Sequence, residues 1–140
     1  MKRTSIHTLA RAAALCACAL APWVAQAQTP VLAPSMKALG EARYVCGGVG
    51  AEESNAMRAA MKDHPLSLLF ARESGAYLAD VQVTVTDAQG SPALSMRAEG
   101  PVCLVDLPAG RYTVEAASEG VAKTQVVSLG NGSKVADFRF

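Results

Sequence analysis

From Leu66 to the C-terminus, apolar and polar residues alternate, and turn residues recur every 8–12 positions. The segment from Val81 to Thr86 shows the pattern clearly, because three valines alternate with glutamine and threonine. Successive side chains of a strand point to opposite faces, so this alternation predicts strands with one buried and one exposed face. Many short strands at this spacing are typical of a β-sandwich or barrel.

Seven short strands can be drawn in the region of residues 65–140, separated by turns rich in glycine, proline and aspartate. They comprise residues 66–73, 78–86, 93–98, 102–107, 111–117, 121–129 and 134–140. Each sheet built from them would have one apolar side to cover, which two antiparallel sheets achieve by packing face to face. We therefore expect a mainly β fold, a seven-stranded antiparallel Greek-key β-sandwich, with one short helix before it.

That helix is expected within residues 47–64. Three glycines in residues 47–50 break the chain, and a run of good helix formers follows from residue 51 to residue 62. Met57 and Met61 lie one helical turn apart, which predicts an apolar face packed on the sheet. The glycine turn is interpreted as structural rather than phosphate-binding, because it lacks the P-loop lysine and places Glu52 and Glu53 where an anion would sit.

Residues 28–46 contain two prolines and a glycine and show no sustained periodicity. We therefore expect an irregular lead-in between the N-terminal segment and the helix.

The N-terminus has the parts of a secretory signal peptide. A basic segment precedes an uncharged apolar run over residues 12–25, and the small residues Ala25 and Ala27 occupy the positions that a signal peptidase reads. We expect cleavage after Ala27, which makes residues 1–27 the signal peptide and the mature chain a periplasmic or secreted protein. An alternative is a lipoprotein, in which Cys18 would carry the lipid.

A membrane anchor is disfavoured, because the apolar run is shorter than the ~20 residues that a spanning helix needs. We therefore expect no transmembrane span in the mature chain. Removal of residues 1–27 leaves ten basic and twelve acidic side chains, a net charge of −2. The basic residues are scattered and have no aromatic neighbours to stack on bases, so we expect no nucleic-acid partner.

Of the four cysteines, only Cys46 and Cys103 remain after cleavage, in a compartment that permits disulfides. We expect them to pair, with Cys103 pointing into the core; two buried free thiols are the alternative. Their spacing fits no metal-binding pattern, and the one remaining histidine, His64, has no partner at ligand spacing. The sequence thus predicts neither a metal site nor a cofactor.

The segment Leu107-Pro108-Ala109-Gly110-Arg111-Tyr112-Thr113-Val114 resembles the Leu-Pro-x-Gly-x-Tyr-x-Val motif of carboxypeptidase regulatory-like domains. The strand at residues 79–85 and the Asp-x-x-Gly turn at residues 87–90 match the same pattern. The resemblance covers residues 45–140 and extends to small exported proteobacterial proteins that carry this one domain. It implies a transthyretin-like (prealbumin-like) sandwich.

The motif has a mechanical role in that fold. Pro108 and Gly110 would form the corner between the sheets after Leu107, and the hydroxyl of Tyr112 would bond to backbone nearby. It is a structural motif and carries no chemistry.

The sequence points away from catalysis. His64 stands beside Pro65 at a predicted helix-to-strand boundary, where a loop histidine is the simpler interpretation. The catalytic carboxypeptidases to which such domains are fused use a His-x-x-Glu zinc motif, and transthyretin-like hydrolases use a C-terminal Tyr-Arg-Gly-Ser; the sequence has neither. We therefore expect no enzymatic activity and no catalytic residues.

The remaining hypotheses are two kinds of binding. The first is an exported module for protein interaction or envelope structure, whose partner would be an envelope protein. The second is a carbohydrate-binding module of the starch-binding-like fold, whose partner would be a polysaccharide. Such sugar sites usually present exposed aromatic rings, and with Trp23 in the signal peptide only Tyr44 and Tyr77 are candidates.

Overall fold

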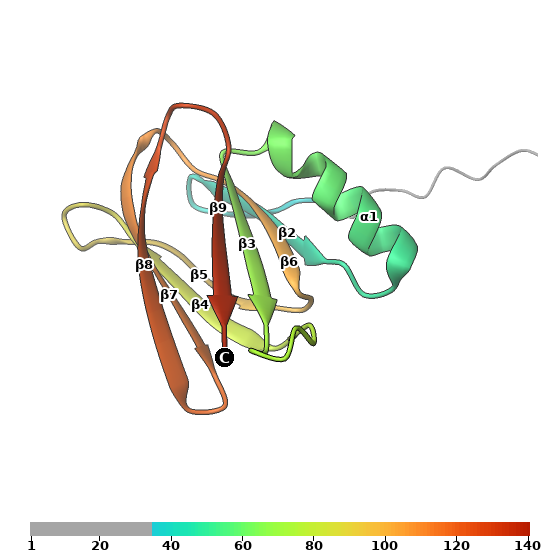
Figure 1. The fold of residues 1–140 in the computed structure, drawn as a ribbon. Coiled ribbons are helices and arrows are strands. Elements are labelled where there is room, and N and C mark those ends of the chain that lie inside the picture. Colours follow the sequence, from blue (N-terminus) through green and yellow to red (C-terminus); the bar gives the residue numbers. More distant parts are fainter. Residues whose placement is uncertain (1–34) are drawn as a thin grey trace, which may run out of the picture. The chain divides into compact units, whose positions relative to one another are not determined.

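The structure is a computed structural model that describes residues 35–140. Nine strands and one helix follow one another along these residues. Figure 1 shows how they are arranged. In chain order they are β1 (Lys37–Leu39), β2 (Ala42–Gly47), α1 (Ala51–Ala60) with the 3₁₀ turn η1 (Met61–Asp63), β3 (Leu66–Ala71), β4 (Val81–Thr86), β5 (Pro92–Ala98), β6 (Val102–Asp106), β7 (Gly110–Ser118), β8 (Val121–Leu129) and β9 (Lys134–Arg139). The expected signal peptide, its cleavage at Ala25 and Ala27, and the alternative at Cys18 lie outside the described residues.

The strands form two sheets, as expected from the alternation. The five-stranded sheet has the order β1-β2-β6-β3-β9, and the four-stranded sheet has the order β5-β4-β7-β8. All neighbouring strands are antiparallel except β3 and β9, the first and last strands of the region after the helix, which are parallel. The expected wholly antiparallel arrangement is therefore wrong for this one pair.

The expected number of seven strands is also wrong, because β1 and β2 precede the helix. The lead-in that we expected to be irregular forms a hairpin over residues 37–47, which turns at Gly40 with a φ of 62°. In β2, Val45 is buried on one face of the sheet, and Tyr44 and Cys46 pack against the core on the other. A strand covered on both faces lacks the apolar-polar alternation that reveals a half-exposed strand, which explains why the pattern did not predict it.

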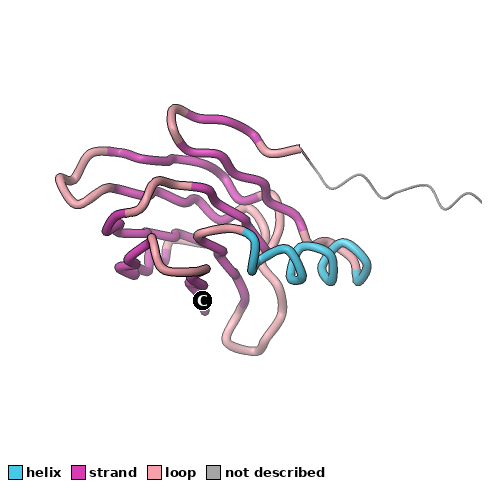
Figure 2. Tube along the Cα trace, turned by 90° about the horizontal axis from the view of Figure 1, so that it is seen from above, coloured by secondary structure: helices cyan, strands magenta, loops and turns pink. Residues whose placement is uncertain are grey.

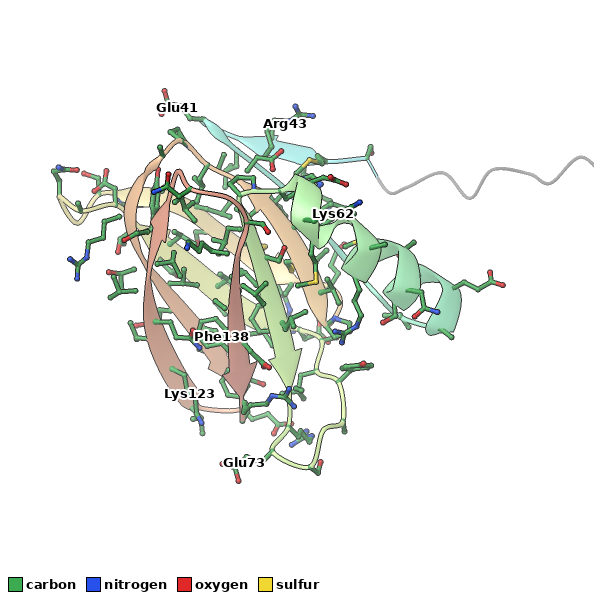
Figure 3. All side chains as sticks on the ribbon, turned by 45° about the horizontal axis from the view of Figure 1, so that its top comes forward. Glu41, Arg43, Lys62, Glu73, Lys123 and Phe138 are labelled. Atoms are coloured by element: carbon green, nitrogen blue, oxygen red, sulfur yellow. A yellow bond between two sulfur atoms is a disulfide. The ribbon has the colours of Figure 1, made fainter. Side chains whose placement is uncertain are left out.

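The main core lies between the two sheets. The three valines of β4 are completely buried there, and the rings of Phe70 and Phe138 stack with centroids 5.9 Å apart. Figure 3 shows Phe138 inside the sandwich, while charged side chains such as Glu73 extend outward. The inward faces predicted from the alternation are those that the structure buries, Cys103 included.

A second, smaller core lies on the outer face of the five-stranded sheet, where α1 covers it (Figure 2). Met57 is 4% exposed and packs against Val45, Val102 and Leu104, with the partly buried Met61 beside them. The predicted packing of the methionine face on the sheet is confirmed. The molecule thus has three layers: the four-stranded sheet, the five-stranded sheet and the helix. No helix within residues 35–140 is long and apolar enough to span a membrane.

Cys46 and Cys103 form a disulfide, as expected, with an S–S distance of 2.06 Å. The two residues are direct register partners across β2 and β6. The sulfur of Cys46 also lies 3.6 Å from the sulfur of Met96 in β5, on the opposite sheet. The bridge therefore joins the hairpin that precedes the helix to the centre of the five-stranded sheet and reaches into the main core.

The double variant Cys46→Ala/Cys103→Ala tests the weight of this bridge. The bridged residues are 57 positions apart, and the chain-entropy model for such a loop predicts a loss of about 4 kcal/mol in the free energy of unfolding. Chemical denaturation of the oxidised wild type and of the variant measures the difference. A difference below about 1 kcal/mol would contradict the predicted contribution.

Ser67 provides a second stability test. Its side chain is completely buried in β3, and its hydroxyl has no hydrogen-bond partner among the described residues. Since an unpaired buried hydroxyl destabilises, Ser67→Ala is expected to leave stability unchanged or to raise it, by up to about 1 kcal/mol. The neighbouring Leu68→Ala, which empties core volume, is expected to cost about 2–5 kcal/mol. A clear loss of stability on Ser67→Ala, measured by the same denaturation, would show that the hydroxyl has a partner.

Candidate functional site: a groove at the glycine loop

The Leu-Pro-x-Gly-x-Tyr segment forms a corner, as the sequence predicts. The hydroxyl of Tyr112 donates a hydrogen bond of 2.8 Å to the carbonyl oxygen of Pro108. Burial of the ring raises the pKa of Tyr112 above its ordinary value, and the negative charges of Asp87 and Glu41 raise it further. The segment therefore holds the start of β7 against the turn that precedes it.

A hollow of about 230 Å³ lies beside this corner. Glu41 and Asp87 are its acidic lining residues. Asp87 is engaged in its own turn, because its Oδ1 accepts backbone N–H bonds of 2.9 Å from both Gln89 and Ser91. Across residues 35–140 there is no group of three or more potential metal-ligating side chains.

His64 is held by Asp106, a pairing that sequence reasoning missed. The Nδ1 atom of His64 lies 2.7 Å from Oδ1 of Asp106, which is 42 positions away at the end of β6. This contact fastens the end of η1 to the five-stranded sheet. Ser67 lies nearby in sequence, but its fully buried hydroxyl has no access to a substrate. The contact between His64 and Asp106 had little signal in the sequence, because only the pairing of β3 with β6 brings these two residues together.

The glycine loop, residues 47–50, links β2 to α1. Gly48 and Gly50 adopt φ values of 91° and 90°, a region that favours glycine. The backbone N–H of Val49 donates a 3.0 Å hydrogen bond to Oε2 of Glu53, in the first turn of the helix. A carboxylate of the chain itself therefore closes the loop, which agrees with the structural interpretation of the glycine turn.

The loop is packed against the turn between β5 and β6. A side chain at Gly100 would overlap the carbonyl oxygen of Gly47, and a side chain at Gly48 would lie 3.0 Å from Val102. The backbones thus approach each other closely, and the loop is fixed in place by the same β6 strand that carries the disulfide.

Tyr77 is the exposed aromatic residue next to this loop. Its side chain is 58% exposed, whereas Tyr44, the other predicted candidate, is half-buried against the main core. Tyr77 is anchored by an isolated antiparallel bridge to Ala71, at the end of β3. In Figure 1 its segment is the green loop between β3 and β4, at the lower right.

Arg58 of α1 holds the tyrosine ring. Its Nη2 atom donates a 2.9 Å hydrogen bond to the Tyr77 hydroxyl, and its guanidinium carbon lies 5.3 Å from the ring centroid. This distance is within the range of a cation–π contact. The ring and the guanidinium therefore restrain each other's orientation at the surface.

Two hollows share Gly48, Gly50 and Tyr77 as lining residues, so Tyr77 stands between them. The first, of about 400 Å³, lies on the helix side, where Ser54 and Asn55 are its polar lining residues beside Tyr77. The second, of about 290 Å³, is more apolar and is completed by Val49, Leu78, Ala79 and Pro101. We call the two hollows together with the Arg58–Tyr77 pair the glycine-loop groove.

No protein-family model matches the sequence, and no curated protein matches it either. The side chains of the groove are therefore the evidence for what it binds. Sequence reasoning identified Tyr77 and the glycine loop but missed Arg58, Ser54 and Asn55. Their helical spacing places them near one another, but no sequence pattern placed the loop of Tyr77 beside that helix.

Tyr112→Phe tests the corner. Loss of the hydroxyl's bond to Pro108 is expected to lower the free energy of unfolding by about 1 kcal/mol at neutral pH. The folded state raises the pKa of Tyr112, so its proton is held more tightly in the folded than in the unfolded chain. This stabilisation is present below the ordinary pKa of about 10 and is lost as the pH rises through the folded-state pKa.

Chemical denaturation from about pH 8 to about pH 11, which spans the titration of tyrosine, measures both the loss of stability in Tyr112→Phe and its dependence on pH. The wild type is expected to lose stability more steeply with rising pH than Tyr112→Phe, while the control Tyr44→Phe keeps the steep wild-type profile. Identical pH profiles for the wild type and Tyr112→Phe would contradict the account of the corner.

Proposed function

We propose that the chain is an exported, non-catalytic β-sandwich module that binds an envelope protein through the glycine-loop groove. The observation that carries this proposal is the Arg58–Tyr77 pair, exposed at the surface and held in one orientation by its own hydrogen bond. Tyrosine and arginine are enriched among the residues that dominate the energy of protein–protein interfaces. A restrained pair also loses less conformational entropy on binding than two mobile side chains.

The fold is consistent with the proposed relation to carboxypeptidase regulatory-like domains. The strands after the helix divide into β6-β3-β9 and β5-β4-β7-β8, so strands that follow each other in sequence repeatedly change sheet. This supports a Greek-key sandwich of the transthyretin-like kind, with β1, β2 and α1 added to it. The hydrogen bond from Tyr112 to Pro108 is the contact that the motif implies.

Export is supported by the Cys46–Cys103 disulfide, since such bonds persist in oxidising compartments. We propose a periplasmic or secreted location reached through the N-terminal signal peptide. Attachment through a lipid on Cys18 is the alternative.

The absence of catalysis is proposed from the state of the candidate nucleophiles. Both cysteines of the described chain are in the disulfide, and the hydroxyl of Ser67 is buried. Tyr77 is exposed, but its hydroxyl accepts a hydrogen bond from the cation Arg58, and within residues 35–140 it donates none to a base that could activate it. The groove is arranged for binding.

A carbohydrate-binding module is the second candidate, and one observation favours it. The larger hollow combines the aromatic Tyr77 with the hydroxyl of Ser54 and the amide of Asn55. Such side chains can bind sugar hydroxyls while an aromatic ring contacts the sugar face.

Site-specific photo-crosslinking distinguishes the two candidates. A benzophenone amino acid is placed at Val49, which is 68% exposed in the groove, or at Val126, which is 53% exposed on the far sheet and serves as the control. In envelope extract, the probe at Val49 is expected to capture one protein reproducibly, and the probe at Val126 is expected not to capture it.

Tyr77→Ala is expected to abolish this capture with little change in stability, because the side chain is mostly exposed. Equal capture at both positions would contradict the proposed site. Binding to a glycan array that depends on Tyr77, without capture of a protein, would favour the carbohydrate-binding candidate instead.

A further inference from the structure

Arg58 differs from two other arginines near the groove in the side chain to which it is bonded. Arg72 is paired with Glu119 at 2.8 Å, and Arg139 is paired with Asp137 at 2.8 Å. In the described part of the chain, Arg58 is bonded to the neutral hydroxyl of Tyr77 and to no carboxylate. A guanidinium has five N–H donors, so most of the hydrogen-bonding capacity of Arg58 is unused.

The hydroxyl of Tyr77 adds a further donor at the same place. Its oxygen accepts the hydrogen bond from Arg58, which leaves its own hydrogen free to be donated. The hollow on the helix side is lined by the uncharged polar residues Ser54 and Asn55, and it has no acidic residue in its lining. At the edge of this hollow, Arg58 and the Tyr77 hydroxyl can therefore both donate hydrogen bonds to one ligand.

Neither acidic residue at the start of α1 forms an ion pair with Arg58. Glu53 is bonded to the backbone N–H of Val49. Glu52 is six positions before Arg58, which places it about 120° around the helix axis. The ligand that matches a cation beside a neutral donor is an anion, and the planar guanidinium matches the geometry of a carboxylate, the anion that an unmodified peptide supplies.

We propose that the glycine-loop groove recognises a carboxylate-bearing peptide segment of the protein partner. The carboxylate, from an aspartate, a glutamate or the chain's C-terminus, binds Arg58 and the Tyr77 hydroxyl. A neighbouring apolar side chain of the same segment occupies the hollow between Val49, Leu78 and Pro101. This inference rests on the proposed function and specifies the partner's chemistry.

Two observations favour a peptide over an acidic polysaccharide. The guanidinium of Arg58 lies over one face of the Tyr77 ring, 5.3 Å from its centroid, which leaves at most the other face for a sugar to stack on. The second hollow is formed by Val49, Leu78, Ala79 and Pro101, which suit an aliphatic side chain rather than sugar hydroxyls. A peptide supplies a carboxylate and an aliphatic group within one or two residues.

The test uses an array of synthetic peptides on a neutral Gly/Ser carrier. Their central residue pairs combine Asp, Asn, Glu or Gln with Leu, Val, Phe or Ser, and a second set ends in Leu or Phe with either a free or an amidated C-terminus. Each peptide is titrated into the isotope-labelled protein. The protein is expressed from the full sequence and purified after any processing by the host. Amide chemical shifts report the binding site and also detect weak binding.

Peptides with a carboxylate beside an apolar residue are expected to shift the signals of residues 48–50, 54–58 and 77–79 in a saturable way. Their amide analogues are expected to bind at least about tenfold more weakly, since a hydrogen bond to a charged group contributes about 1.5–3 kcal/mol. Arg58→Gln is expected to abolish the preference for acid over amide. The matched control Arg72→Gln, which removes an arginine already paired with Glu119, is expected to keep it.

Equal binding of acids and amides, equal effects of Arg58→Gln and Arg72→Gln, or no binding by any peptide would each overturn the inference. Oligogalacturonate is titrated in parallel as an acidic sugar, and its binding through Arg58 without peptide binding would overturn both the inference and the protein-binding function. Crosslinking at Val49 shows whether only the carboxylate inference fails. If Arg58→Gln still captures the protein and Tyr77→Ala does not, the carboxylate inference is overturned and the protein-binding function is kept.

Discussion

Burial of the five-stranded sheet on both faces is the constraint on which the rest of the structure depends. Its central strand β6 contributes Cys103 and Val105 to the core between the sheets and Val102 and Leu104 to the core beneath α1. The disulfide to Cys46 fixes the neighbouring strand β2 to it. Because β2 leads directly into the glycine loop and α1, the position of the groove is set by the packing of β6.

The strands after the helix are the part of the fold that was predictable. Strands β3 to β9 either alternate between buried and exposed residues, as β4 does, or lie between clear turn signals, as β3 and β6 do, so their positions followed from the sequence. The position of the hairpin of β1 and β2 did not, because β1 has three residues and β2, which is covered on both faces, lies outside the region of regularly spaced turn signals. The parallel pairing of β3 with β9 depends on how the two ends of the sandwich meet, which no local pattern encodes.

The candidate site was predictable only in its individual parts. Tyr77 was recognisable as an aromatic residue outside the strongest core pattern, and the glycine loop as a break before a helix. Arg58 was not recognised, because a single arginine on a helix is usually solvated and the partner of this one is 19 positions away. Tertiary structure brings the two together, and their contact turns an ordinary surface into a restrained pair of donors.

Tyr112 holds one end of the sandwich together, and we propose that the groove at the glycine loop, at the other end, is the binding site. Hydrogen–deuterium exchange of the chain, alone and with its captured partner, tests this placement directly. The account predicts new protection in residues 47–58 and 72–80, with unchanged exchange in β4, β5, β7 and β8. Protection confined to the four-stranded sheet, with no change at the glycine loop, would contradict it.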